Sequence, residues 1–193
     1  MRPDVRTLRS LIDEGRRFEI EHAVYFIIES CKAFAHADPR GAISPIRILI
    51  SSSGDVALDD PFAPDALREG LGYVAPEIVP RPESDRSLTM DLRTSQLPRI
   101  AFPIEFDRPA AAVFSIGCVL WELLAGRPLF RGENDYQTLQ LAAAAVVPPL
   151  SSVPRELETL VRKALAKNLG VRYRNPEQLA KALGDYLLRR ARN

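Results

Sequence analysis

The sequence VFSIGCVLWELLAG, residues 113–126, gives the clearest indication of the fold. It is apolar nearly all round, and only Ser115 and Glu122 interrupt the apolar run. Such a pattern is typical of a helix that is buried on every side, and the run is too short to cross a bilayer. Gly126 supplies a stop, because glycine readily adopts the left-handed conformation that ends helices. We therefore predict a buried helix here, as the spine of the core.

Other helices are predicted on both sides of this spine. Apolar residues recur at three- and four-residue spacing in the long N-terminal segment, which is the mark of an amphipathic helix. Near the C-terminus, Asn175 and Gln178 match a capping pair around Pro176. The predicted helices run around Val5 to Glu14, from Ile20 to Phe34, from near Asn134 to about Ala145, from Pro154 onward, and after Asn175.

Strand signals are confined to one place. Ile48-Leu49-Ile50 and Val56-Ala57-Leu58 are short apolar runs on either side of SSSGD, a turn-rich connection. This arrangement favours a β-hairpin. The fold class expected from the sequence is therefore mainly α, with one small β-hairpin.

Length and composition limit the protein further. The 193 residues fit a single domain, 1–193. The 26 basic and 25 acidic side chains form no long like-charge block, which argues against nucleic acid or a membrane as partner. Cys31 and Cys118 lack the spacing of a zinc site or a disulfide framework. With no secretory signal at the N-terminus, a cytoplasmic protein is expected.

A proline-rich segment interrupts the helical pattern. Five prolines fall between Ile78 and Ala111, so we interpret about 80–110 as an insertion that runs over the surface. Apolar side chains on such a segment pack back onto the domain, bind a partner or remain disordered. The candidates for a partner-binding surface are Leu92, Leu97, Ile100, Phe102 and Phe106.

Several motifs in order then point to a family. They are RILISSSGDVAL (47–58), GYVAPE (72–77) and VFSIGCVLWELLAGRPLF (113–130). Together with the helix order, they resemble the C-terminal lobe of bacterial serine/threonine protein kinases over nearly the whole chain. The resemblance implies a protein-kinase C-lobe-like helical domain. In that family, separate residues place the nucleotide, the metal ions and the acceptor hydroxyl, so each of these positions is compared in turn.

The resemblance places altered residues at the catalytic positions. Ala42 stands where the family has its catalytic aspartate, and Arg47 stands at the asparagine that binds magnesium. Asp60 aligns with the other magnesium-binding residue, but Pro61 and Phe62 replace the Phe and Gly that follow it. Since the chain starts where the C-terminal lobe begins, the glycine-rich loop and strand lysine are also missing. We therefore predict no catalytic residue, no cofactor and no metal, and a protein that is not an enzyme.

An ion pair with a structural role is also predicted. Glu77 matches the glutamate of the family's A-P-E motif, and Arg172 matches the late arginine that pairs with it. The resemblance implies a buried or partly buried ion pair between them. Without a nucleotide-binding lobe, the face near 48–58 and Phe62 is expected to be exposed and to bind another protein or a second copy of the chain.

The function predicted from the sequence is that of a catalytically inactive kinase-like protein, a pseudokinase, which acts as a protein-binding, scaffold or regulatory module in bacterial signalling. One alternative is a serine/threonine protein kinase fragment with weak phosphotransferase activity, whose N-terminal lobe is supplied by a partner or encoded upstream. Another alternative is a structural subunit of an oligomer.

Overall fold

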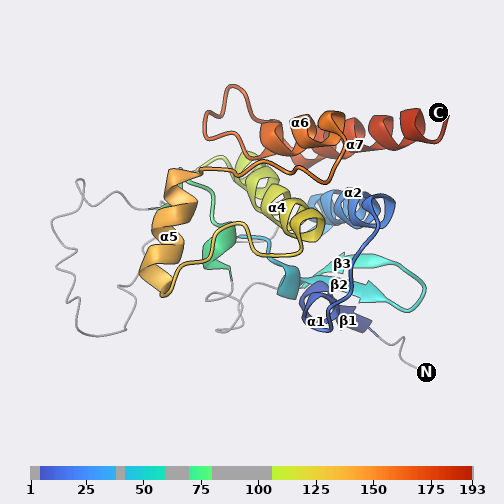
Figure 1. Cartoon of the computed structure of the whole chain (residues 1–193), viewed down its shortest axis with the longest axis horizontal. Coiled ribbons are helices and arrows are strands. Elements are labelled where there is room, and N and C mark those ends of the chain that lie inside the picture. The colour runs from blue at the N-terminus through green and yellow to red at the C-terminus, as the bar shows by residue number, and fades with distance from the viewer. Residues whose placement is uncertain (1–4, 38–41, 60–69, 80–105, 193) are drawn as a thin grey trace, which may run out of the picture.

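The computed structural model describes residues 5–37, 42–59, 70–79 and 106–192. The element order is β1 (Val5–Thr7), α1 (Leu8–Asp13), α2 (Ile20–Ala37), η1 (Pro45–Arg47), β2 (Ile48–Ser51), β3 (Val56–Leu58), η2 (Leu71–Tyr73), α4 (Arg108–Ala125), α5 (Asp135–Ala144), α6 (Arg155–Ala164) and α7 (Pro176–Arg190). The predicted mainly α fold class is confirmed. In Figure 1, α6 and α7 lie at one end, the sheet and α1 at the other, and α2 and α4 between them.

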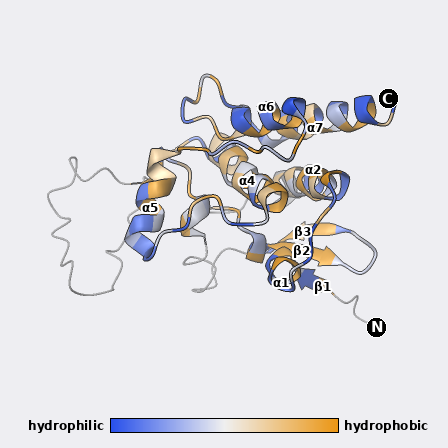
Figure 2. Cartoon of the chain, in the orientation of Figure 1, coloured by the Kyte–Doolittle hydropathy of each residue, from blue (hydrophilic) through white to orange (hydrophobic). Residues whose placement is uncertain are grey.

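The α4 helix is the buried spine that the sequence predicts. Its side chains from Ala110 to Leu123 are buried, including Phe114 and Trp121, and Figure 2 shows α4 in mostly apolar colours. Asp107 caps its start by accepting a hydrogen bond from the Ala110 amide at 3.0 Å, and Gly126 ends it at φ 70°. By length and composition α4 could cross a membrane, but 78% of it is buried inside the protein. It is therefore the core helix of a globular fold.

The sheet is larger than predicted. Three strands pair antiparallel in the order β1-β2-β3, with Val5 opposite Ser51 and Ile50 opposite Val56. The predicted hairpin is present, but the prediction of a helix from Val5 is wrong, because α1 begins only at Leu8. β-branched side chains such as Val5 and Thr7 favour extended backbone, and the Thr7 hydroxyl caps α1 by accepting from the Ser10 amide.

The α2 helix joins the two ends of the molecule. It packs against β3, α4 and α7, and it buries Ala23, Val24, Ile27 and Cys31 completely. Burial raises the pKa of the Cys31 thiol, and it also raises that of Cys118 in α4. Both cysteines are free and buried, so they pack as apolar side chains.

Several residues named in the predictions lie outside the described residues. They are Leu92, Leu97, Ile100 and Phe102 in the predicted insertion, and Asp60 and Phe62 earlier in the chain. The domain bounds and the insertion at about 80–110 therefore stay predictions. Phe106 is described, and it is half-buried against the hydrophobic core just before α4 begins.

A close contact of α4 at Gly117 gives a stability prediction. A Cβ atom on Gly117 would lie 3.1 Å from the Ala164 Cβ and 3.2 Å from the Leu165 Cδ2. Gly117→Val should therefore lower the free energy of unfolding by about 1–3 kcal/mol through overpacking. Gly184→Ala is the control, because nothing lies within 4 Å of its Cβ and alanine should stabilise helix α7 by about 0.5–1 kcal/mol. Urea unfolding followed by Trp121 fluorescence measures both, and equal effects would contradict the close packing.

Candidate functional site

The position that the resemblance assigns to a magnesium ligand holds a buried cation. Arg47, at the end of η1, is 3% exposed. Its Nη1 donates to the Ala42 carbonyl at 2.9 Å, and its Nη2 donates to the Asp59 carbonyl at 3.2 Å. The Asp59 amide in turn donates to the Arg47 carbonyl at 2.9 Å. The guanidinium therefore joins the segment before η1 and β2 to the residue that follows β3.

This arrangement does not fit a magnesium ion. Magnesium needs oxygen ligands, whereas a guanidinium has only donors and carries a permanent positive charge. The methyl group of Ala42 provides no oxygen either. Within the described ranges, no group of three or more His, Cys, Asp or Glu side chains is placed to hold a metal, and Asp60 lies outside those ranges.

The structure brings Glu77 and Arg172 together. Arg172 donates from Nη1 to Glu77 Oε1 at 2.7 Å and from Nη2 to Glu77 Oε2 at 3.0 Å. The Arg172 side chain is 0% exposed and that of Glu77 is 20% exposed. Arg172 also donates to the carbonyls of Ala110 and Ala166. This geometry is the buried ion pair that the resemblance implies, and it ties the segment after η2 to the first turn of α4 and to the residues just after α6.

A second buried network lies at the other end of α4. Glu122 is 1% exposed, and its carboxylate accepts hydrogen bonds from the Tyr73 hydroxyl and, at 3.0 Å, from Arg9 Nη1. Arg9 Nη2 also donates to the Tyr73 oxygen at 2.8 Å. Burial and then the negative charge of Glu122 raise the pKa of Tyr73, so the phenol stays protonated and donates.

Sequence reasoning missed this network. Glu122 was noted only as an interruption of an apolar helix, and Arg9 was not singled out. A signal was nevertheless present, because a carboxylate in a helix that is apolar all round must be paired when it is buried. The identity of the partner was not readable, since Arg9 is 113 positions away from Glu122 in the chain.

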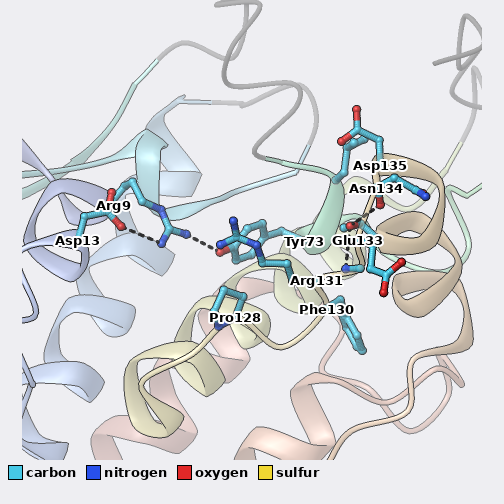
Figure 3. A pocket seen from close by; sticks show the side chains of 13 residues that line it. Arg9, Asp13, Tyr73, Pro128, Phe130, Arg131, Glu133, Asn134 and Asp135 are labelled. Carbon is cyan, nitrogen blue, oxygen red and sulfur yellow. Dashed lines mark hydrogen bonds and ion pairs between the residues drawn. The ribbon is translucent and has the colours of Figure 1, made fainter. Parts of the chain in front are cut away.

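A pocket opens directly beside this network, with a volume of about 500 Å³. Its walls come from α1, from η2, from the connection between α4 and α5, and from the start of α5. Figure 3 shows Arg9 and Asp13 on one side and Glu133, Asn134 and Asp135 on the other. The lining of the pocket therefore includes both positively and negatively charged side chains.

Close backbone contacts hold the pocket's walls in place. A Cβ atom on Gly72 would lie 2.4 Å from the Phe130 carbonyl oxygen, so only glycine permits this approach of η2 to the α4–α5 connection. The connection is also fixed to α5, because the Gly132 amide donates to the Thr138 hydroxyl at 3.0 Å. The pocket is thus largely formed before any ligand arrives, which lowers the entropic cost of binding.

The buried ion pair gives a stability prediction with a matched control. Arg172→Met leaves the partly buried Glu77 carboxylate without its cation, and it should cost about 3–5 kcal/mol of unfolding free energy. Arg189→Met removes an ion pair to Glu156 whose side chains are 55% and 49% exposed, and it should cost much less. Thermal and urea unfolding measure both, and similar losses would show that Arg172 has no special structural role.

The second network predicts strong coupling between Arg9 and Glu122. Arg9→Met should be strongly destabilising, because it leaves the buried Glu122 carboxylate without its cation. Adding Glu122→Gln should recover part of that loss, since the amide still accepts from Tyr73 and carries no charge. A double-mutant cycle on unfolding free energies should give a coupling of about 1–3 kcal/mol. Additive effects would refute the interaction.

Comparison with known proteins gives relatives but no matching family model. The chain is 28% identical to the serine/threonine-protein kinase PknB of Mycolicibacterium smegmatis over 188 residues, which are 90% of the chain and 27% of that protein. It is 25% identical to PknB of Mycobacterium leprae over 91% of the chain and 28% of that protein. It is 28% identical to a probable PknB of Bifidobacterium longum over 75% of the chain and 20% of that protein.

These relatives correct one prediction. The sequence led us to expect a protein that is not an enzyme, but the relatives are named as serine/threonine-protein kinases, which are enzymes. The residues at positions 42 and 47 do not by themselves demonstrate a loss of activity. The chain spans about a quarter of the length of the curated relatives it matches. The chain, with its mainly helical fold and small sheet, is similar to the bacterial serine/threonine kinases named PknB.

Proposed function

We propose that this chain is the protein-binding lobe of a serine/threonine protein kinase-like protein, and that it holds an extended protein segment in the pocket between α1, η2 and the start of α5. The observation that carries the proposal is the pocket itself, which is preformed and lies against the buried Arg9–Tyr73–Glu122 network. The kinship supports it, because the relatives' name describes kinases that act on serine and threonine in proteins.

The size and chemistry of the pocket suit a peptide. Its volume of about 500 Å³ falls within the range of ligand sites, about 300–1,000 Å³. Its lining includes Arg131 and Glu133, two exposed side chains of opposite charge on the α4–α5 connection. Such a lining suits a partner segment that itself carries polar and charged groups, because charge complementarity provides orientation and specificity.

The rigidity of the pocket supports binding rather than a purely structural role. A segment that docks here meets walls set by η2 and by a connection pinned to α5 at Thr138 and Asn134. Because these walls are already fixed, most of the conformational entropy lost on binding is lost by the partner segment. We expect a partner protein in the cytoplasm, and a second copy of the chain, bound through the face near 48–58, remains the alternative partner.

A peptide selection tests this proposal. Peptides from a random displayed library would be selected on the chain, and their dissociation constants measured by fluorescence anisotropy. The double substitution Arg131→Glu with Glu133→Arg keeps the net charge and reverses the two charges at the pocket. We expect it to weaken binding about tenfold or more, since wrongly placed charges cost several kcal/mol at interfaces.

The control is a second charge-preserving swap, Lys181→Glu with Asp185→Lys, on the exposed side of α7. It should leave the dissociation constant unchanged. If the two swaps affect the selected peptides equally, or if only the control weakens binding, the pocket is not the binding site and the proposal fails.

A further inference from the structure

A long part of the chain begins and ends at one place beside the pocket. Residues 80–105, which lie outside the described residues, connect the segment after η2 to the segment before α4. Arg172 Nη1 donates to Glu77 Oε1 at 2.7 Å and to the Ala110 carbonyl at 3.0 Å. Because one nitrogen atom binds a group on each side of residues 80–105, the two ends of this segment are held close together.

The place where these ends meet adjoins a wall of the pocket. Tyr73 lines the pocket, and it precedes Glu77 by four residues, so their Cα atoms lie at most about 15 Å apart. From the other side, the Ser115 hydroxyl of α4 donates to the Tyr73 carbonyl at 2.7 Å. A chain of this length that doubles back on itself extends up to about 40 Å from its ends. The pocket is therefore within reach of residues 80–105.

The lining of the pocket suits a segment with charged groups of both signs and with apolar side chains. Its charged residues include Arg131 and Glu133, and its apolar residues include Leu71 and Phe130. Charge complementarity at such a surface favours a partner whose positive and negative groups alternate. A segment of one charge sign only would meet repulsion on one side of the pocket.

The amino-acid sequence of residues 80–105, PRPESDRSLTMDLRTSQLPRIAFPIE, has these properties. Four arginines and four acidic residues leave it without net charge, and apolar residues are spaced among them. It also contains four prolines, and proline fixes φ at a value that favours extended backbone. The composition therefore matches the extended, charged segment that the pocket suits.

The covalent connection favours this segment over a free partner. Because its ends are held beside the pocket, its binding is intramolecular, and short flexible connections give local concentrations in the millimolar range. A detached peptide that binds with a Kd of about 100 µM would, once tethered in this way, occupy the pocket roughly ten times as often as it leaves it. Modest complementarity is therefore sufficient.

We propose that residues 80–105 bind in the pocket of their own molecule, between α1, η2 and the start of α5, and that a partner protein has to displace them. This inference rests on the proposed function, because it takes the pocket to be a site for protein segments. It adds the identity of the segment that competes with a partner.

Peptide binding to three forms of the whole chain tests the proposal. One form is the intact chain, one carries a glycine–serine linker of equal length in place of residues 80–105, and one carries the same residues in scrambled order. The probes are a synthetic peptide of residues 80–105 and library peptides selected on the linker form. Fluorescence anisotropy measures binding, and Trp121 fluorescence during urea unfolding identifies the forms that keep the fold.

Both probes should bind the linker and scrambled forms about tenfold or more tightly than the intact chain, because only the intact chain has a competing segment. Introducing Arg131→Glu with Glu133→Arg into the linker form should weaken the binding of both probes about tenfold. Light scattering should show the intact chain as a monomer. Peptide affinity that falls as the concentration of the intact chain rises would assign the competing segment to a second copy and overturn the intramolecular contact.

The remaining outcomes separate this inference from the proposed function. Library peptides that bind the pocket while the peptide of residues 80–105 does not would overturn the inference and leave the proposed function standing. Equal affinities of the library peptides for the intact, linker and scrambled forms would do the same. If the charge swap at positions 131 and 133 alters the binding of neither probe, the proposed function itself fails, and the inference fails with it.

Discussion

The bidentate ion pair between Arg172 and Glu77 joins segments that are 95 positions apart in the chain. The Arg172 side chain is fully buried, and it also binds the carbonyls of Ala110, in the first turn of α4, and Ala166, just after α6. Its guanidinium lies 5.0 Å from the Phe114 ring centroid. This one side chain therefore joins the segment that follows η2 to the start of the central helix and to the residues just after α6.

Buried charged side chains occur at other places in the core as well. Among the described residues, the charged side chains buried in the core are Arg47, Glu122 and Arg172. Burying a charge is costly unless its partners are well placed. Glu122 and Arg172 bond to groups that are far away in the chain, whereas Arg47 bonds to the nearby carbonyls of Ala42 and Asp59. Apolar packing alone would tolerate small shifts of α4 against its neighbours. We infer that Glu122 fixes α1 and η2 against α4, and that Arg172 fixes the segment around Glu77 against the start of α4.

The chain is similar to kinases over about 90% of its length. Glu77 and Arg172 form the ion pair that the resemblance implies, and Arg47 stands at the position that the resemblance assigns to a metal ligand. The altered residues at the aligned positions do not establish a loss of activity, because phosphoryl transfer depends on the placement of several groups. The pocket beside Arg9, Tyr73 and Glu122 is a feature that stands on geometry alone.

Features that are local in the chain could be predicted from the amino-acid sequence. The apolar run of α4, the glycine that ends it, the Asn175 cap of α7 and the hairpin of β2 and β3 are all patterns over neighbouring residues. The Glu77–Arg172 pairing came from resemblance to a family, and the structure contains it. Tertiary structure decided the rest: the strand at Val5–Thr7, the partners of Glu122, the contacts of Arg47 and the pocket. The physical reason is that hydrophobic periodicity and capping are short-range, while the pairing of β1 with β2 and of Arg9 with Glu122 arises only when distant segments pack together.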